Sequence, residues 1–195
     1  MRRPLVAGNW KMNGTATMAA DLATQVAAAA VSGIDTLLCP PAPYLATVNT
    51  ALANSPVNLG GQDCSEHAQG AFTGEIAADM LRDSGASYVL VGHSERRQFF
   101  GDNDQRVAAK VARAHSNGLI PVLCVGETLD QRNAGDTEAV IERQLERVLQ
   151  LGNAATIITE LVIAYEPVWA IGTGESASPE QAQAVHAWIR KRLAQ

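Results

Sequence analysis

The sequence predicts an α/β fold in which parallel strands alternate with helices that cover both faces of the sheet. Short runs rich in Val, Ile and Leu recur along the chain without polar alternation, as expected of strands buried on both sides. Stretches with helical spacing of apolar residues, such as Ile141, Leu145 and Val148, lie between them. The six predicted strands cover residues 5–7, 36–39, 57–59, 88–91, 119–125 and 161–165.

The ends of several helices are also marked in the sequence. Glycines follow helical stretches and precede strands at four places, where a left-handed C-terminal cap is expected: Gly33, Gly85, Gly118 and Gly152. The last helix is expected to begin at Ser178-Pro179-Glu180-Gln181, which combines a capping serine, a proline at the first helical position and a glutamine at the third. Six βα units therefore follow one another without a linker, and we expect a single domain over residues 1–195.

Repeated βα units form either an open, doubly wound sheet or a closed barrel. The first strand is not followed by a glycine-rich phosphate loop; it ends in Gly8-Asn9-Trp10-Lys11, which argues against a dinucleotide-binding sheet. Polar residues follow several different strands, at Asn9 and Lys11, at His93 and at Glu166. A barrel gathers the carboxyl ends of all its strands around one mouth, so the barrel is the favoured architecture.

Composition excludes several classes of function. The 195 residues are 47% hydrophobic, with a net charge of −5 and a pI near 5.3, which argues against a surface for nucleic acid or anionic membranes. Only 5% of residues are aromatic, too few to suggest base-stacking platforms. The three cysteines show no metal-ligand spacing, and no apolar stretch resembles a signal peptide or a membrane span. We expect a cytoplasmic protein.

The segment from Tyr165 to Gly174, Tyr-Glu-Pro-Val-Trp-Ala-Ile-Gly-Thr-Gly, has the features of a hinged lid with a base at its root. A predicted strand delivers the carboxylate of Glu166, and Pro167 fixes the backbone that follows it. The apolar residues between Pro167 and Gly172 can exclude water from a reacting substrate. Gly172 can present a bare N–H to a ligand because it lacks a side chain.

Two further strand ends carry candidate functional groups. His93 follows a strand and precedes a turn that opens a short helix, where amide N–H groups favour a neutral imidazole that donates a hydrogen bond. Lys11 is one of only three lysines among 15 basic residues, so a compact ammonium at this strand end suggests a contact with phosphate or substrate oxygen. His67, His115 and His186 lack such a context and are interpreted as surface or packing residues.

Five motifs, in order along the whole chain, resemble those of the triosephosphate isomerase family. They are Ala7-Gly-Asn-Trp-Lys-Met-Asn13, Gly70-Ala-Phe-Thr-Gly-Glu75, Val91-Gly-His-Ser-Glu-Arg-Arg97, Pro121-Val-Leu-Cys-Val-Gly-Glu-Thr128 and the lid segment. The resemblance implies a (β/α)8 TIM barrel and the isomerisation of a phosphorylated triose through an enediolate. It implies Glu166 as the base and His93 as the electrophile, Lys11 as a further catalytic residue, and Asn9, Lys11 and Gly172 as substrate-binding residues.

The resemblance also implies a homodimer and a reaction without a cofactor or metal. The segment from Gln62 to Glu75 is long for a βα loop, and loops above roughly 12 residues are often functional. In the family this loop reaches the neighbouring subunit, where the residue matching Thr73 touches the partner's active-site loop and the one matching Glu75 faces an arginine equivalent to Arg96. Glu127 is expected to support the site, and Cys124 to be a buried structural residue.

The chain departs from the family in length, because eight βα units of about 250 residues close such a barrel and only six are found here. We therefore expect an open partial barrel, weakly active at best as given. Two other functions are compatible with the sequence. One is a non-catalytic oligomerising fragment of the same fold, and the other is a phosphate-binding barrel for another small sugar phosphate.

Overall fold

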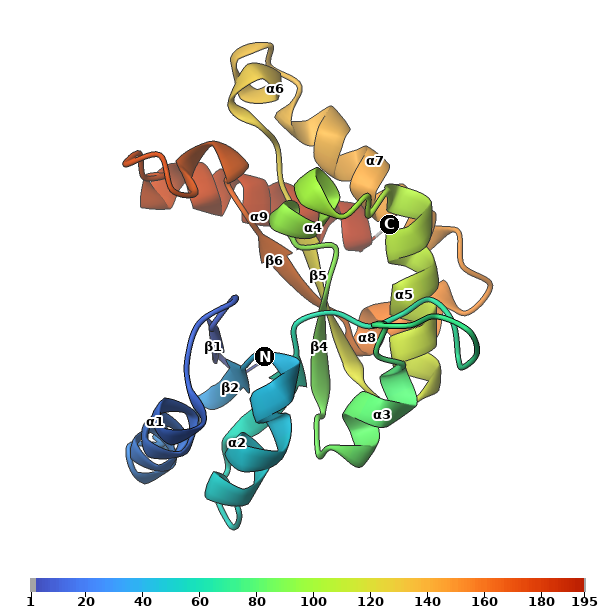
Figure 1. The fold of residues 1–195 in the computed structure, drawn as a ribbon. Helices are drawn as coiled ribbons and strands as arrows, with labels where there is room; N and C mark the ends of the chain where they lie inside the picture. Colours follow the sequence, from blue (N-terminus) through green and yellow to red (C-terminus); the bar gives the residue numbers. More distant parts are fainter. Residues whose placement is uncertain (1–2, 195) are drawn as a thin grey trace. The chain divides into compact units, whose positions relative to one another are not determined.

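The computed structural model describes residues 3–194, which alternate strands and helices as the sequence predicts (Figure 1). The β1–β2, β2–β3, β3–β4 and β5–β6 ladders are parallel, and the strands follow one another across the sheet in chain order, from β1 to β6. The described chain forms two compact units, residues 3–91 with 113–121 and residues 92–112 with 122–194.

The first unit is built on four consecutive strands. Parallel ladders join β1 to β2, β2 to β3, and β3 to β4, with Ala7 opposite Leu37 and Gly61 opposite Val89. Its elements are β1 (Leu5–Asn9), α1 (Ala16–Ala28), β2 (Asp35–Cys39), η1 (Ala42–Tyr44), α2 (Leu45–Ala51), β3 (Asn58–Gly61), α3 (Ala78–Asp83) and β4 (Tyr88–Val91). Buried apolar side chains from both element types, including Ala19, Val48 and Leu37, form its core.

The second unit contains the ladder between β5 (Ile120–Val125) and β6 (Val162–Tyr165), which runs from Val122 opposite Val162 to Val125 opposite Tyr165. Its helical elements are α4 (Ser94–Phe99), α5 (Asp104–Ser116), α6 (Leu129–Asn133), α7 (Thr137–Leu149), α8 (Ala154–Glu160), η2 (Val168–Ala170) and α9 (Pro179–Leu193). Both α5 and β5 have their other ends in the first unit. The apolar stripe of α7 is buried at the predicted Ile141, Leu145 and Val148.

The predicted helix ends are largely confirmed. Ser178 caps α9, its side chain accepting a hydrogen bond from the Gln181 amide while the Gln181 side chain accepts one from the Ser178 amide. Gly33, Gly85 and Gly118 adopt the predicted left-handed conformation. The prediction for Gly152 is wrong: its φ is not positive, because the chain after α7 continues into α8 rather than directly into a strand. The prediction of a single domain stays a prediction.

Within residues 3–194, every helix is too short or too polar to cross a lipid bilayer.

The second unit buries an ion pair next to α4 and α5. The carboxylate of Asp102 lies 2.9 Å from the Lys110 ammonium and 3.3 Å from Arg96 Nε, and the side chains of Asp102 and Lys110 are both fully buried. A buried ion pair of this kind ties the loop before α5 to the body of that helix, because separating it would leave an uncompensated charge away from water.

Replacing Asp102 by alanine is expected to lower the free energy of unfolding by roughly 3–5 kcal/mol, the cost typical of removing one partner from a buried ion pair. Arg106→Ala is the control, since Arg106 is partly exposed and its Nη1 lies 3.9 Å from Asp102 Oδ1. That change should cost less than about 1 kcal/mol. Urea unfolding of both variants measures the difference, and equal losses would contradict a dominant role for the Asp102–Lys110 pair.

Candidate active site

The carboxylate of Glu166 is held in a defined position directly after β6. The Glu166 amide donates to the Val125 carbonyl at 2.8 Å, which extends the β5–β6 ladder by one residue. Its side-chain oxygens have two different partners: Oε1 lies 2.8 Å from His93 Nε2, and Oε2 accepts a hydrogen bond from the Ser94 amide at 2.9 Å. One side-chain donor and one backbone donor from the segment after β4 therefore fix the carboxylate.

His93 is the N-cap residue of α4, as the sequence predicts. Its Nδ1 accepts a hydrogen bond from the Glu95 amide at 3.2 Å. Because an imidazole nitrogen that accepts an amide proton cannot itself carry one, the proton of the neutral ring lies on Nε2. Nε2 then donates to Glu166, and the ring is nine-tenths buried. The helix start thus selects one tautomer of a neutral imidazole, aimed at the carboxylate.

Asn9 and Lys11 belong to the first unit and form one tight turn at the end of β1. The Asn9 side chain accepts a hydrogen bond from the Lys11 amide at 3.0 Å. Gln62 fixes the turn from the next segment, since its side-chain amide donates to the carbonyls of Lys11 and Cys39, both at 2.9 Å. Lys11 has a φ of +51°, a strained backbone that non-glycine residues rarely adopt and that is concentrated at functional sites.

The lid segment begins with the short 3-10 helix η2 and contains the predicted glycine turn. Gly172 has a φ of +70°, and no atom lies within 4 Å of the position where a Cβ would be. The Thr173 hydroxyl donates to the Trp169 carbonyl at 2.9 Å, which closes the segment on itself. The indole N–H of Trp169 donates to Glu127 Oε1 at 3.1 Å, so the lid is anchored outside its own residues.

Glu127 anchors the lid segment through the hydrogen bond from the Trp169 indole. Its side chain is fully buried, and Oε1 also accepts hydrogen bonds from the Tyr165 hydroxyl and from Arg132 Nη1, each at 2.9 Å. The Arg132 guanidinium stacks over the Trp169 ring at 4.7 Å from its centroid. Burial and then the Glu127 carboxylate raise the pKa of Tyr165 to about 12, which keeps its hydroxyl a donor at ordinary pH.

Sequence reasoning missed two residues that shape this site. Gly126 is needed because a Cβ there would overlap the Glu166 carbonyl oxygen. Gln144, buried on α7, donates to the Gly126 carbonyl at 3.0 Å and accepts from its amide at 2.8 Å, holding the turn after β5. The Gly126-Glu127 pair at a strand end signals a close backbone approach, whereas a glutamine in a helical stripe carries no comparable signal.

The structure brings two predicted residues, His93 and Glu166, into direct contact, and it joins the other two strand-end residues, Asn9 and Lys11, in one turn. Over residues 3–194 there is no group of three or more His, Cys, Asp or Glu side chains arranged to hold a metal ion. A parallel α/β fold that pairs a carboxylate with a neutral imidazole, each directly after a strand, has the features of an acid–base enzyme.

Comparisons with known proteins agree with this class. The family model described as triosephosphate isomerase matches residues 4–195. The triosephosphate isomerases of Alkalilimnicola ehrlichii and Thiobacillus denitrificans are 53% and 55% identical to the chain, which is covered completely and spans 77% of each relative. The crystal structure of triosephosphate isomerase from Bartonella henselae matches with a TM-score of 0.87 at 40% identity, covering 98% of this chain and 76% of that one.

The chain therefore belongs to the triosephosphate isomerase family, whose members are isomerases, and it has the α/β TIM-barrel type of fold with six parallel strands. The prediction of a partial barrel is confirmed, because the match to the solved structure covers about three quarters of that chain. The resemblance of its five sequence motifs is confirmed as well.

Tyr165→Phe is expected to lower the free energy of unfolding by about 1–2 kcal/mol, because a buried carboxylate loses one of its donors. The raised pKa of Tyr165 also predicts a pH effect. The folded state holds this proton more tightly than the unfolded state, so the stabilisation is complete below about pH 10 and is lost as pH rises toward 12.

Urea unfolding between pH 8 and pH 11 measures both effects. The difference in stability between the wild type and Tyr165→Phe should shrink as the pH rises. Tyr44→Phe is the matched control, since the Tyr44 hydroxyl donates to the exposed Gly14 carbonyl and not to a buried carboxylate. A difference that is constant with pH would contradict the role given to the Tyr165 hydroxyl.

Proposed function

We propose that the chain catalyses the interconversion of dihydroxyacetone phosphate and D-glyceraldehyde 3-phosphate through an enediolate, with Glu166 as the base and His93 as the electrophile. The observation that carries this proposal is the pairing of the Glu166 carboxylate with a neutral, Nε2-protonated His93. A carboxylate and a neutral imidazole donor, held together by backbone amides, are the two groups that an enediolate mechanism requires.

In the proposed reaction, substrate oxygens take the Nε2–H hydrogen bond that His93 gives to Glu166 in the structure. The released carboxylate removes a proton from C1 of dihydroxyacetone phosphate, and the electron pair of the broken C–H bond forms the C1–C2 double bond of the enediolate. His93 donates to the oxygens on C1 and C2, and proton transfer between these oxygens allows Glu166 to return its proton to C2. The product is the aldehyde, with no net gain or loss of atoms.

Three further residues complete the proposed substrate site. Lys11 would balance the charge of the phosphate or the enediolate, and Asn9 would donate to the carbonyl oxygen. The strained, doubly fixed turn that carries both residues supports these roles. Gly172 would supply a backbone N–H to the phosphate, supported by the open space around its Cα and by its left-handed conformation.

Glu166→Gln is expected to lower kcat by about 10²–10⁴-fold, the usual contribution of a general base, while the fold persists. Glu175→Gln is the matched control, because Glu175 is exposed and lies outside the proposed catalytic pair. Deuterium incorporation into dihydroxyacetone phosphate in D2O, followed by NMR, detects even slow turnover. An absence of turnover both in the wild-type chain and in a version extended by the C-terminal part of a relative would overturn the proposed function.

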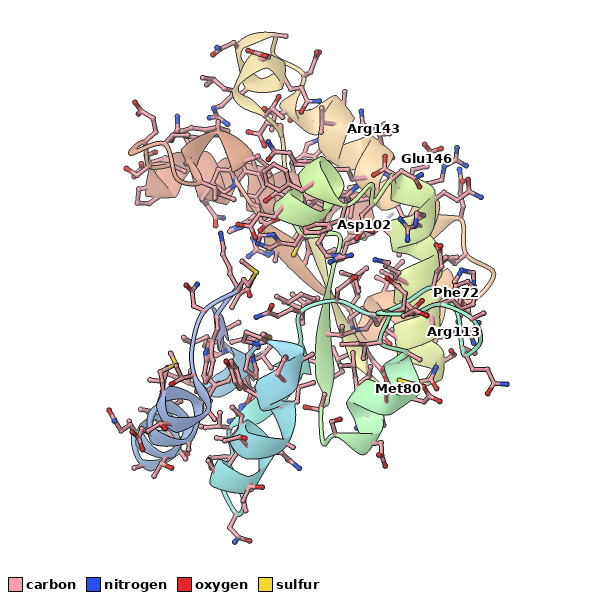
Figure 2. The ribbon with its side chains drawn as sticks, viewed as in Figure 1. Phe72, Met80, Asp102, Arg113, Arg143 and Glu146 are labelled. Carbon is pink, nitrogen blue, oxygen red and sulfur yellow. The ribbon has the colours of Figure 1, made fainter. Side chains whose placement is uncertain are left out.

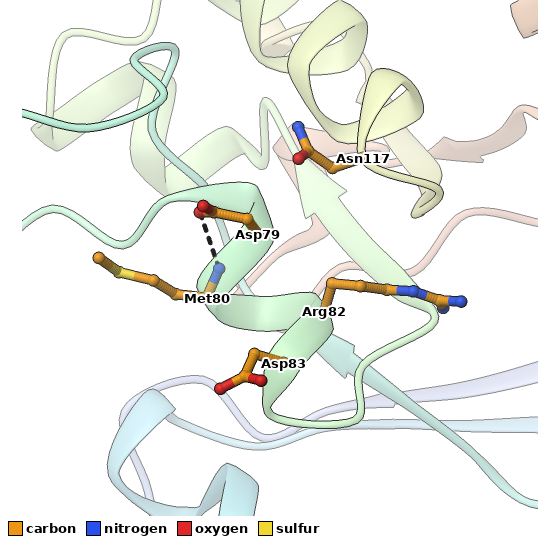
Figure 3. A pocket seen from close by; sticks show the side chains of 5 residues that line it. All are labelled: Asp79, Met80, Arg82, Asp83 and Asn117. Carbon is orange, nitrogen blue, oxygen red and sulfur yellow. Dashed lines mark hydrogen bonds between the residues drawn. The ribbon is translucent and has the colours of Figure 1, made fainter.

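We further propose that the protein is a cytoplasmic homodimer that uses the loop from Gln62 to Glu75. Support comes from the exposed apolar groups of this region. Phe72 and Met80, labelled in Figure 2, are 41% and 55% exposed. The Phe72 ring stacks flat on His67 at 3.8 Å between centroids. Met80 also lines a cavity of about 550 Å³ at α3 (Figure 3), together with Asp79, Arg82, Asp83 and Asn117.

Phe72→Asp is expected to weaken self-association by at least about tenfold, because central aromatic residues commonly contribute 2 kcal/mol or more to an interface. Val31→Asp is the control, since Val31 is 60% exposed in the connection before β2 and lies outside the loop. Sedimentation equilibrium from 0.1 to 100 μM gives the dissociation constants. A wild-type chain that stays monomeric over this range, or equal effects of the two changes, would contradict the proposed interface.

A further inference from the structure

Arg97, on α4, makes hydrogen bonds that the proposed mechanism does not use. Its Nε donates to the Gly92 carbonyl at 2.8 Å, its Nη2 donates to the Cys124 carbonyl at 3.4 Å, and its Nη1 lies 2.6 Å from Asp104 Oδ1. The side chain is only 17% exposed. One guanidinium therefore joins three segments: the residue before His93, strand β5 and the start of α5.

The Gly92 backbone shows how closely this guanidinium is packed. Gly92 has a φ of +73°, and a Cβ there would lie 3.0 Å from Arg97 Nη2 and 2.9 Å from Val107. The peptide that leads into His93 is therefore held by a hydrogen bond to its carbonyl oxygen and by packing against its α carbon. Glycine is required at this position for both its conformation and its lack of a side chain.

The position of His93 depends on this region because α4 is too short to fix itself. It contains only six residues, and isolated helices shorter than about 12–15 residues are marginal in water. The Glu95 amide that selects the His93 tautomer and the Ser94 amide that binds Glu166 both belong to its first turn. An interaction that fixes this turn relative to β5 therefore also fixes both hydrogen bonds to the reacting groups.

Asp104 orients the guanidinium from the side opposite the carbonyls. Its Oδ1 pairs with Arg97, and its Oδ2 lies 3.1 Å from Arg143 Nε. Arg143 is on α7 (Figure 2) and is 58% exposed, and its Nε donates to Asp104 rather than to either carbonyl. A planar guanidinium can serve a carboxylate and two carbonyls at once, whereas a lysine ammonium is a single flexible point of charge.

We propose that Arg97 is a positioning residue for His93: by binding the Gly92 and Cys124 carbonyls, it fixes the turn that aims the imidazole at its reaction partner. This inference rests on the proposed function in taking His93 as the electrophile. The partners of Arg97 are the Gly92 and Cys124 carbonyls and Asp104, so it acts on the imidazole through the backbone. A purely structural role would affect stability alone, whereas a positioning role also changes the state of the His93 ring.

The first test reads the His93 ring directly, by ¹⁵N NMR of the full chain with labelled histidine, and needs no turnover. The wild type should show one protonated and one unprotonated ring nitrogen for His93. In Arg97→Lys and Arg97→Gln, both signals should move toward the average of two exchanging tautomers. Arg143→Gln, which removes the other partner of Asp104, should leave the signals at their wild-type positions.

The second test compares kinetics under conditions where circular dichroism shows every variant folded. Arg97→Lys is expected to lower kcat by about 10–100-fold, as misplacement of a reacting group does, with KM within about threefold of the wild type. If Arg97→Gln does not fold, Asp104→Asn replaces it, since it loosens Arg97 without removing it and should shift the His93 signals in the same direction.

The outcomes separate this inference from the proposed function. Unchanged His93 signals in the folded Arg97 and Asp104 variants would overturn the positioning role, whatever the activity. Changed signals with wild-type kcat would overturn it as well, because His93 would then not need to be positioned. Changed signals in a protein that lacks isomerase activity would support the role of Arg97 in orienting the ring while refuting the proposed function.

Discussion

The hydrogen-bonded pair of His93 and Glu166 is the interaction on which the arrangement of the second unit depends. The two residues follow different strands, so their contact at 2.8 Å requires both strand ends to be held in place. The β5–β6 ladder does this for Glu166, with its last hydrogen bond to the Val125 carbonyl. Gly126 allows the two chains to approach because it has no side chain in the path of the Glu166 backbone. The imidazole is placed by a helix start, whose amides serve the carboxylate and the ring together.

A second buried carboxylate, Glu127, links this pair to the lid. Burying a charge is unfavourable unless donors replace the lost water, and here three donors converge on one oxygen. They come from α6, from the last residue of β6 and from the lid itself. The residue before Glu166 and the indole of the lid segment therefore share one acceptor.

Much of this could be predicted from the sequence because the responsible signals are local. The apolar runs predicted all six strands, and the residues after them predicted His93 as a helix start and Glu166 as a strand-end carboxylate. Features that depend on tertiary packing could not be predicted from the sequence. Strand β3 continues through Gly60 and Gly61, beyond its predicted end. Glycine is needed at position 61 because a Cβ there would lie 2.7 Å from Leu81, and nothing in the local pattern shows that neighbour. The helix α8 was missed for a similar reason: its seven residues have only two buried positions, too few for a periodic pattern. Gln144 forms its hydrogen bond with a residue 18 positions away in the sequence, and Arg97 binds carbonyls 5 and 27 positions away, so neither contact is visible in the local pattern.

The central claim of the proposed function is that the paired His93 and Glu166 bind one phosphorylated three-carbon molecule. The most direct measurement is a crystal structure of the chain with 2-phosphoglycolate, whose carboxylate resembles an enediolate. The account predicts His93 Nε2 within hydrogen-bond distance of the ligand carboxylate and the Glu166 carboxylate over its carbon. A ligand bound elsewhere, with His93 still paired to Glu166, would contradict the account.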